Sequence, residues 1–569
     1  MPRRRTHRGA LLLLALAIGL GAPAAILAQE ATPAAPGASI TRDEFRRQLL
    51  DRFPMEPVGR TGGAVVVGET GDITTVNGIL TSDYPTFYVT GSIYETLLTG
   101  SPIDGAIVPG LADSWTVAPD GVTYTFRLNP AATWHDGTDF TADDVKFSFD
   151  AVLDPNTGSF YTTGVNEAVA SYRVVDPDTF EIVARDRFVD FLYNAPGTVL
   201  IMPKHVWEPV GFEAWTFDGG STGADPARVV GTGPFKFREW VQGDHVTLVR
   251  NDAYWDQVPS IDEFTIRILP DDTSAVQALK TGEIDVMGIV PATETQGVID
   301  TANLKVDVYD LLDSTFYAMN LDPEATPLFK DVAVRQALYH AINRQAITDT
   351  LFAGYGEIGA GTQPKLSAAY APERMTTQYP YSHDRARELL AQAGWTDSDD
   401  NGTVDKDGDE FSFDLIYTGG SGTVDGLVAN LKDQWQAIGV EVDIQEEDGS
   451  VLLERLDDHD FEMALLAFSW GPDGGQGPVF ACASADRAFN FMSYCNAQWD
   501  ALEEQQKREF DPAKRRELLI QQSDIVWTEQ PIGLIRFGVG RTGYATKLHN
   551  FYPNGYGLLW SLAYVWVDG

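Results

Sequence analysis

The feature that most constrains the fold is a long alternation of short β-rich runs with amphipathic helices, without a repeat of fixed period. The run 64–68 is typical of a buried strand, and residues 121–128 alternate apolar with polar side chains as a half-buried strand does. Apolar residues at helical spacing predict helices over 141–152 and 332–347. Single cores stop growing near roughly 250–300 residues. The chain has 569 residues, so it is predicted to be a multi-domain α/β protein.

The N-terminal residues resemble a signal sequence for export. Residues 3–8 carry four arginines, 9–20 form an apolar run, and small residues follow up to Ala28. This is the pattern of a secretory signal peptide, so we expect cleavage after residue 28 and a periplasmic or extracytoplasmic protein. The alternative is an uncleaved membrane anchor. Residues 29–57 are predicted to form a flexible tether and a short docking helix capped by Thr41.

Charge and motifs exclude several classes of protein. Lysine and arginine total 41 against 82 aspartates and glutamates, a net charge of −41 that repels nucleic acid. Two cysteines are too few for a cysteine-built zinc site. No nucleophile elbow, H-E-x-x-H motif or phosphate loop is present, and the eight histidines show no metal-ligand spacing. We therefore expect no enzyme and no required cofactor. His135 is read as a loop or packing residue.

Several segments, in order along the chain, carry a family resemblance. They contain the runs NPAATWHDGTDFTADDV, GTGPFKF, ALKTGEIDV, FKDVAVRQAL and RELLAQAGW, and lie at 129–145, 231–237, 278–286, 329–338 and 387–395. Together they resemble signatures of the family-5 extracellular solute-binding proteins, the peptide and nickel receptors of ABC importers. One such run is weak evidence, but the whole ordered set is specific.

The resemblance implies a two-lobed α/β fold of the periplasmic-binding-protein type, class II, with an extra inserted domain and a hinge. The chain would be a monomer that binds a small peptide-like solute between its lobes and passes it to an ABC permease. Hinge crossings are expected near 287–295 and 532–540. The implied domains are I at 58–79, 226–290 and 536–569, II at 80–225, and III at 291–535.

The same resemblance suggests binding residues. Trp470 and Asp473 follow an apolar strand, as in the family segment where an aromatic and an aspartate meet a peptide's α-amino group. Asp473 is therefore the candidate for the amine, against the alternative of a turn aspartate. Phe468, Tyr317 and Tyr94 are candidate pocket walls, because aromatic faces recognise peptides and sugars. The alternative for each of them is core packing.

Cys482 and Cys495 are the only cysteines of an exported chain, and they match a pair found in some members of the family. They are predicted to form a disulfide, the alternative being two free thiols.

A short acidic loop resembles the first part of an EF-hand calcium loop. Oxygen ligands would come from alternate positions, with Gly402 at the sharp turn and Gly408 where the bidentate glutamate belongs. The loop predicts a structural Ca²⁺ site, against the alternative of a solvated acidic turn. Its candidate ligands are Asp397, Asp399, Asn401, Thr403 and Asp405.

Three other functions stay open from sequence. The same fold could bind an oligosaccharide or another small solute, although dispersed histidine argues against free nickel. A secreted hydrolase is an alternative of another class, opposed by the missing nucleophile motifs. A receptor that senses or chaperones without a transporter is the third.

Overall fold

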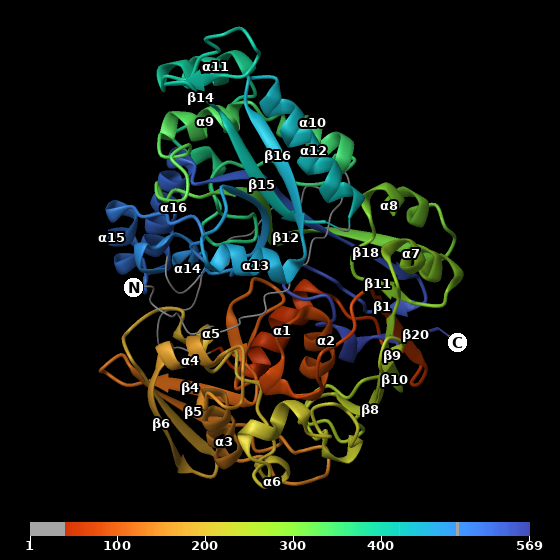
Figure 1. The fold of residues 1–569 in the computed structure, drawn as a ribbon. Coiled ribbons are helices and arrows are strands. Elements are labelled where there is room, and N and C mark those ends of the chain that lie inside the picture. Colours follow the sequence, from red (N-terminus) through yellow and green to blue (C-terminus); the bar gives the residue numbers. More distant parts are fainter. Residues whose placement is uncertain (1–39, 420, 485–488, 569) are drawn as a thin grey trace.

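The computed structural model describes residues 40–419, 421–484 and 489–568. This part of the chain forms two lobes, which lie one above the other in Figure 1 and are joined by one continuous mixed sheet. The sheet has ten strands in the order β16-β15-β17-β12-β18-β11-β1-β10-β9-β8. The predicted two-lobed α/β architecture is therefore confirmed. Within the described ranges, none of the helices has the length and apolarity needed to span a membrane.

The first lobe, lower in Figure 1, is built on one half of this sheet. Its central strand, at the predicted place, is parallel to both neighbours and buries Val65 and Val67 completely. Two helices cover it, and the first of them ends at Gly282, whose φ of 78° suits glycine. The elements are β1 (Ala64–Glu69), α2 (Tyr84–Ile93), β8 (Phe235–Val241), β9 (His245–Arg250), β10 (Glu263–Ile268), α7 (Asp272–Thr281), β11 (Val286–Met287) and α8 (Ala292–Ile299).

An antiparallel domain is inserted between β1 and β8. Its four strands run in the order β4-β5-β7-β6, and its residues share one apolar core with the first-lobe sheet. The predicted helix is α3 (Ala142–Leu153), which begins in a capping box between Thr141 and Asp144. The other elements are β2 (Leu98–Gly100), β3 (Ile107–Pro109), β4 (Ala112–Val117), β5 (Thr123–Leu128), α4 (Thr162–Ala168), β6 (Val169–Asp176), β7 (Thr179–Ala184), α5 (Phe191–Asn194) and α6 (Lys204–Trp207).

The second lobe carries the parallel strands β15 and β16 and most of the long helices. The single helix predicted over 332–347 is two helices, α9 and α10. The side chain of Asn343 accepts a hydrogen bond from the Ala346 amide and so caps the second helix. The elements are α9 (Val332–His340), α10 (Arg344–Leu351), α11 (His383–Gln392), β13 (Asp405–Lys406), β14 (Asp409–Glu410), β15 (Ser412–Thr418), α12 (Gly422–Gln436), β16 (Glu441–Glu447), α13 (Gly449–Asp457), β17 (Met463–Ser469), α14 (Gly477–Phe480), α15 (Ala497–Gln506) and α16 (Pro512–Glu529).

Two long antiparallel strands connect the lobes, β12 (Leu304–Met319) and β18 (Ile532–Ala545). Their pairing register shifts between Asp310 and Ser314. Each strand therefore belongs to one lobe before this break and to the other lobe after it. The second crossing agrees with the expected 532–540. The first lies later in the chain than the expected 287–295, because α8 packs against β12 and β18 before the chain crosses.

The N-terminal helix and the C-terminal segment pack on the first lobe. The helix α1 (Arg42–Arg52) is capped by Thr41 as predicted, and Arg42 pairs with Asp113 at 3.2 Å. Phe53 then contacts the rings of Tyr552 and Trp560. These contacts fix the docking helix to the body. The C-terminal segment adds β19 (Leu548–His549) and β20 (Trp566–Val567).

Candidate functional site

One set of contacts joins the lobes away from the connecting strands. The segment 186–189 of the inserted domain meets the turn 507–510 between α15 and α16. The Val189 amide donates to the Lys507 carbonyl at 2.9 Å. An Arg508 nitrogen lies 2.7 Å from a carboxylate oxygen of Asp186. Because these two segments belong to different lobes, we call this contact the latch.

The latch also contains a cation–π contact. The guanidinium of Arg187 lies 4.3 Å from the ring centre of Phe510. Such contacts contribute about 0.5–1 kcal/mol at exposed sites. The latch is therefore a weak connection that can break when the lobes separate.

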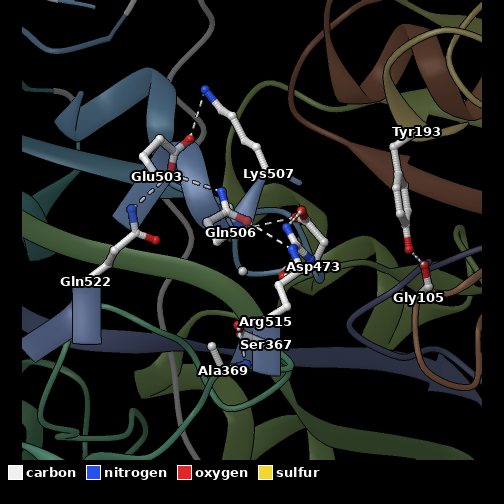
Figure 2. Close-up of polar contacts among 12 residues, drawn as sticks. Gly105, Tyr193, Ser367, Ala369, Asp473, Glu503, Gln506, Lys507, Arg515 and Gln522 are labelled. Atoms are coloured by element: carbon white, nitrogen blue, oxygen red, sulfur yellow. Dashed lines mark hydrogen bonds and ion pairs between the residues drawn. The ribbon is translucent and has the colours of Figure 1, made fainter. Parts of the chain in front are cut away.

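Asp473, the candidate amine partner, is held by Arg515. An Arg515 nitrogen lies 2.9 Å from Oδ2 of Asp473, and another donates to the Asp473 backbone carbonyl at 3.0 Å (Figure 2). Within the described residues, the other carboxylate oxygen, Oδ1, accepts only a 3.4 Å hydrogen bond from the Gly475 amide. Asp473 is therefore fixed in orientation by one oxygen, while the second is weakly engaged.

A polar network behind this pair fixes Arg515 on α16. Its Nε donates to Gln506 at 2.9 Å, and Gln506 in turn donates to Glu503 at 3.0 Å. Glu503 also accepts a hydrogen bond from the Gln522 side chain at 2.9 Å and forms an ion pair with Lys507 at 3.1 Å (Figure 2). Since Lys507 begins the turn of the latch, the same helix pair supports both the latch and Asp473.

Asp473 faces the first lobe. Asp190, directly after the latch segment, has a raised pKa because it is buried and because the negative charge of Asp473 is near, an effect that Arg515 opposes. Oδ1 of Asp190 is buried and has no hydrogen-bond partner among the residues that the structure describes. Tyr193, whose hydroxyl donates to the Gly105 carbonyl at 2.7 Å, also feels the charge of Asp473. Two carboxylates from opposite lobes thus meet at the lobe boundary.

A second part of the lobe boundary lies at the start of α2. The Tyr84 hydroxyl is 3.5 Å from Oγ of Ser469, the last residue of β17 in the second lobe. Tyr84 is 57% exposed and Phe87 is 49% exposed, although both lie on a helix whose opposite face is buried. Sequence reasoning missed these aromatics, whose signal was the spacing of three residues between Tyr84 and Phe87 directly after the capping Asp83.

The predicted aromatic residues divide into two groups. Trp470 donates to Oγ of Ser314 at 2.7 Å and packs with Phe468, which is half-buried at the end of β17. Tyr317 and Tyr94 are 0% and 1% exposed and lie in the two apolar cores. The structure therefore places Trp470 and Phe468 in an apolar cluster of the second lobe and Tyr317 and Tyr94 inside the cores as packing residues.

The acidic loop at 397–405 is exposed and folds on itself. The Asp397 carboxylate accepts the amides of Asn401 and Gly402, and the Asp405 carboxylate accepts the amide and hydroxyl of Ser398. Among the described residues, no group of three or more His, Cys, Asp or Glu side chains is arranged to hold a metal. The calcium site stays a prediction.

The cysteine prediction is confirmed, since Cys482 and Cys495 form a disulfide.

His135 lies in a loop and makes structural contacts, as predicted. Its Nδ1 accepts the Gly231 amide at 3.1 Å, and its Nε2 lies 3.0 Å from the Gly233 carbonyl. The ring thereby fastens the inserted domain to the loop that leads into β8.

Surface depressions occur elsewhere. One of about 540 Å³ in the second lobe is lined by residues that include Arg344, Glu357, Tyr379 and Trp527. Another of about 420 Å³ lies along α7. Neither includes a residue of the latch, of the Asp473 pair or of the aromatic face of α2.

Comparison with known proteins decides the family. A model described as bacterial extracellular solute-binding proteins, family 5, middle region, matches residues 106–490. The oligopeptide-binding protein AppA of Bacillus subtilis is 30% identical over 449 residues, 78% of this chain and 80% of that protein. The chain belongs to family 5 of the bacterial extracellular solute-binding proteins. The resemblance in its sequence segments is confirmed.

Other family-5 proteins agree in sequence and fold. The glutathione-binding protein GsiB of Salmonella typhimurium is 28% identical over 479 residues, 82% of this chain and 87% of that protein. The solved structure of Bacillus subtilis AppA with a nonapeptide has a TM-score of 0.78 at 26% identity, covering 90% of this chain and 100% of that one. The structure of NikZ from Campylobacter jejuni with Ni(L-His), at 22% identity, covers 88% of this chain and 99% of that one and shares the fold, with a TM-score of 0.73.

Proposed function

We propose that this family-5 solute-binding protein is the extracytoplasmic receptor of an ABC importer for small peptides. The solute binds between the lobes, closure follows because it contacts both lobes at once, and the closed form delivers the solute to a membrane permease. Relatives named for oligopeptide and glutathione binding, and a similar structure that holds a nonapeptide, support a peptide-like solute. The protein acts as an exported monomer whose signal at residues 1–28 is cleaved.

The observation that carries this proposal is the state of Asp473 at the lobe boundary. Arg515 fixes Oδ2, and in the part of the chain that the structure describes Oδ1 accepts only a long hydrogen bond, so one oxygen is oriented and available for an ammonium group. Trp470 and Phe468 precede it in the chain, and both pack in the apolar cluster of the second lobe. We assign the peptide's α-amino group to Asp473 on these grounds.

The arrangement favours binding over catalysis. Arg515 pairs with Asp473 and orients it as an anion that a cationic group can meet, and the sequence offers no nucleophile motif. We therefore propose no catalytic residue and no required cofactor. An oligosaccharide or other small solute is the alternative for the same site, and a secreted hydrolase is the alternative of another class.

Thermal shift with separate pools of tripeptides, pentapeptides and oligosaccharides tests the proposal, because a ligand that binds the native state raises the melting temperature. We expect stabilisation by peptides alone, with the peptides recovered intact by mass spectrometry. Stabilisation by sugars alone would favour the alternative solute, and cleaved peptides would reveal a hydrolase.

We also propose that the loop at 397–405 binds Ca²⁺ weakly as a structural ion. The missing glutamate at its twelfth position lowers the affinity toward the millimolar range of extracellular modules. Calorimetry with millimolar Ca²⁺ should show binding that Asp397→Asn removes, and chelation should lower the melting temperature without altering peptide affinity. Absence of heat at millimolar Ca²⁺ would reject the site.

A further inference from the structure

The turn of the β2–β3 hairpin meets the second lobe beside Asp473. The two strands are antiparallel, and residues 101–106 form the turn between them. Its buried residue Gly105 lies against Pro472, which belongs to the loop that follows β17 in the second lobe. Since Pro472 directly precedes Asp473 in the chain, this contact lies next to the residue assigned to the peptide's amine.

The turn is fixed to its own lobe by hydrogen bonds. The Gly105 amide donates to the Ser101 carbonyl at 2.8 Å, which closes the turn. The Gly105 carbonyl accepts the Tyr193 hydroxyl at 2.7 Å (Figure 2). The Asn554 side chain donates to the Pro102 carbonyl at 2.9 Å. Because three hydrogen bonds hold the turn, it yields little when the other lobe presses on it.

The close approach leaves no room for a side chain at Gly105. A Cβ atom there would lie 2.7 Å from both Cβ and Cγ of Pro472 and 2.9 Å from Cε1 of Tyr556. Carbon atoms that are not bonded pack at about 3.5–4.0 Å, so these distances are too short. The Pro472 ring is stiff, and its carbonyl accepts the Ala368 amide at 3.1 Å. The Tyr556 hydroxyl donates to the Leu366 carbonyl of the second lobe at 3.2 Å, so both neighbours are held in place.

We propose that Gly105 is a positioning residue that sets how closely the two lobes approach, and thereby sets the affinity for the solute bound between them. This inference rests on the proposed function, in which the solute contacts both lobes at once. Because Gly105 has no side chain, the lobes meet at Pro472 and the latch forms. A side chain at this position would hold them apart.

The backbone of Gly105 allows a matched control. Its φ is 75°, a left-handed value that asparagine adopts more readily than most residues with a side chain. Gly158, in the same inserted domain, has a φ of 73°, and a Cβ atom added there would meet no atom of the described residues within 4 Å. Gly105→Asn and Gly158→Asn therefore have a similar backbone cost and differ in the space around the new side chain.

Hydrogen exchange at the Val189 amide measures closure directly. This amide donates across the lobe boundary to the Lys507 carbonyl at 2.9 Å, so it is protected while the lobes are in contact. Exchange is measured without solute and with an equimolar pool of Ala-Ala-Ala, Ala-Lys-Ala and Ala-Glu-Ala. We expect protection in wild type and Gly158→Asn. In Gly105→Asn the amide should exchange about tenfold or more faster, the range that overpacking produces.

A change in the other lobe separates loss of closure from local damage to the turn. Gly105→Asn combined with Pro472→Gly should regain part of the protection, because it removes both proline atoms that the new Cβ would meet. Damage confined to the turn would not be relieved by a change in the second lobe. The proposal is overturned by a Val189 amide that is unprotected in wild type under both conditions, by equal exchange in the two asparagine variants, or by a double variant that exchanges as fast as Gly105→Asn.

Thermal shift with the same peptide pool tests the proposed function separately. An apparent affinity about tenfold weaker in Gly105→Asn than in Gly158→Asn would support both the peptide solute and the role of Gly105. Protection that is lost in Gly105→Asn, without stabilisation of any variant by the pool, would support the role of Gly105 and count against the peptide solute. Equal stabilisation and equal exchange in all proteins would support the peptide solute and refute the role of Gly105.

Discussion

The guanidinium of Arg508 lies 2.7 Å from the carboxylate of Asp186, and this exposed pair connects the two lobes far from the strands that cross between them. Its neighbours in the latch are a backbone hydrogen bond and a cation–π contact. A receptor that closes by domain motion needs contacts that form only in the closed state. The latch has the place and the modest strength for this role.

Reversing the charge on one side of the latch should open the protein. Asp186→Arg places like charges together, so small-angle scattering should give a larger radius of gyration than for wild type. The double variant Asp186→Arg with Arg508→Asp should restore the wild-type value. High salt should weaken the wild-type contact, since the Debye length is only about 3 Å at 1 M. Identical scattering from all three proteins would deny the latch a role in closure.

Asp473→Asn should lower both stability and amine recognition. Removing the carboxylate leaves the guanidinium of Arg515 largely buried without its anion, at a cost of roughly 1.5–3 kcal/mol in the free energy of unfolding. The variant should also lose more affinity for a free-amine peptide than for the same peptide N-acetylated. Equal losses for the two peptides in calorimetry would leave Asp473 a structural residue only.

His135 should make the protein sensitive to mild acid. Burial lowers its pKa to about 4 in the folded protein, against about 6.5 unfolded. As the pH falls through this window the unfolded chain takes up the proton first, so stability is lost from about pH 6.5 down to about pH 4. The loss should be roughly 3 kcal/mol, since one pKa unit corresponds to about 1.36 kcal/mol.

The measurement is urea unfolding of wild type and His135→Gln at pH 7 and pH 4.5. The variant should show a smaller difference between the two pH values, whereas His383→Gln, outside this contact, should behave as wild type. Parallel pH profiles for all three proteins would contradict the assignment.

The disulfide between Cys482 and Cys495 should stabilise the second lobe by restricting the unfolded chain. Replacing both cysteines by alanine should lower the free energy of unfolding by about 3 kcal/mol, the loop-closure value for a loop of about 15 residues. Denatured, non-reduced wild-type protein should contain no titratable thiol. Two thiols per chain would refute the bond.

Local signals in the sequence predicted local structure well. The Thr141 capping box, the Thr41 cap and the strand 64–68 each depend on residues a few positions apart, and each is found in the structure. The family segments also predicted the two-lobed fold. The predicted domain boundaries stay predictions, because strand pairing shows only where the chain crosses between the lobes.

Long-range pairings could not be read from the sequence. Arg515 meets Asp473 across 42 positions, and no arginine could be assigned to that carboxylate from spacing alone. Tyr317 and Tyr94 were candidate walls because tyrosines serve both cores and pockets, and only burial tells the two apart. The break at Asn343 depended on a cap inside an otherwise regular apolar pattern.

Native mass spectrometry of the purified protein with an equimolar pool of short peptides and oligosaccharides tests the central claim most directly. The account predicts one intact peptide per chain, with Asp473→Asn releasing it at lower collision energy. A bound oligosaccharide, a cleaved peptide or no retained solute would contradict it.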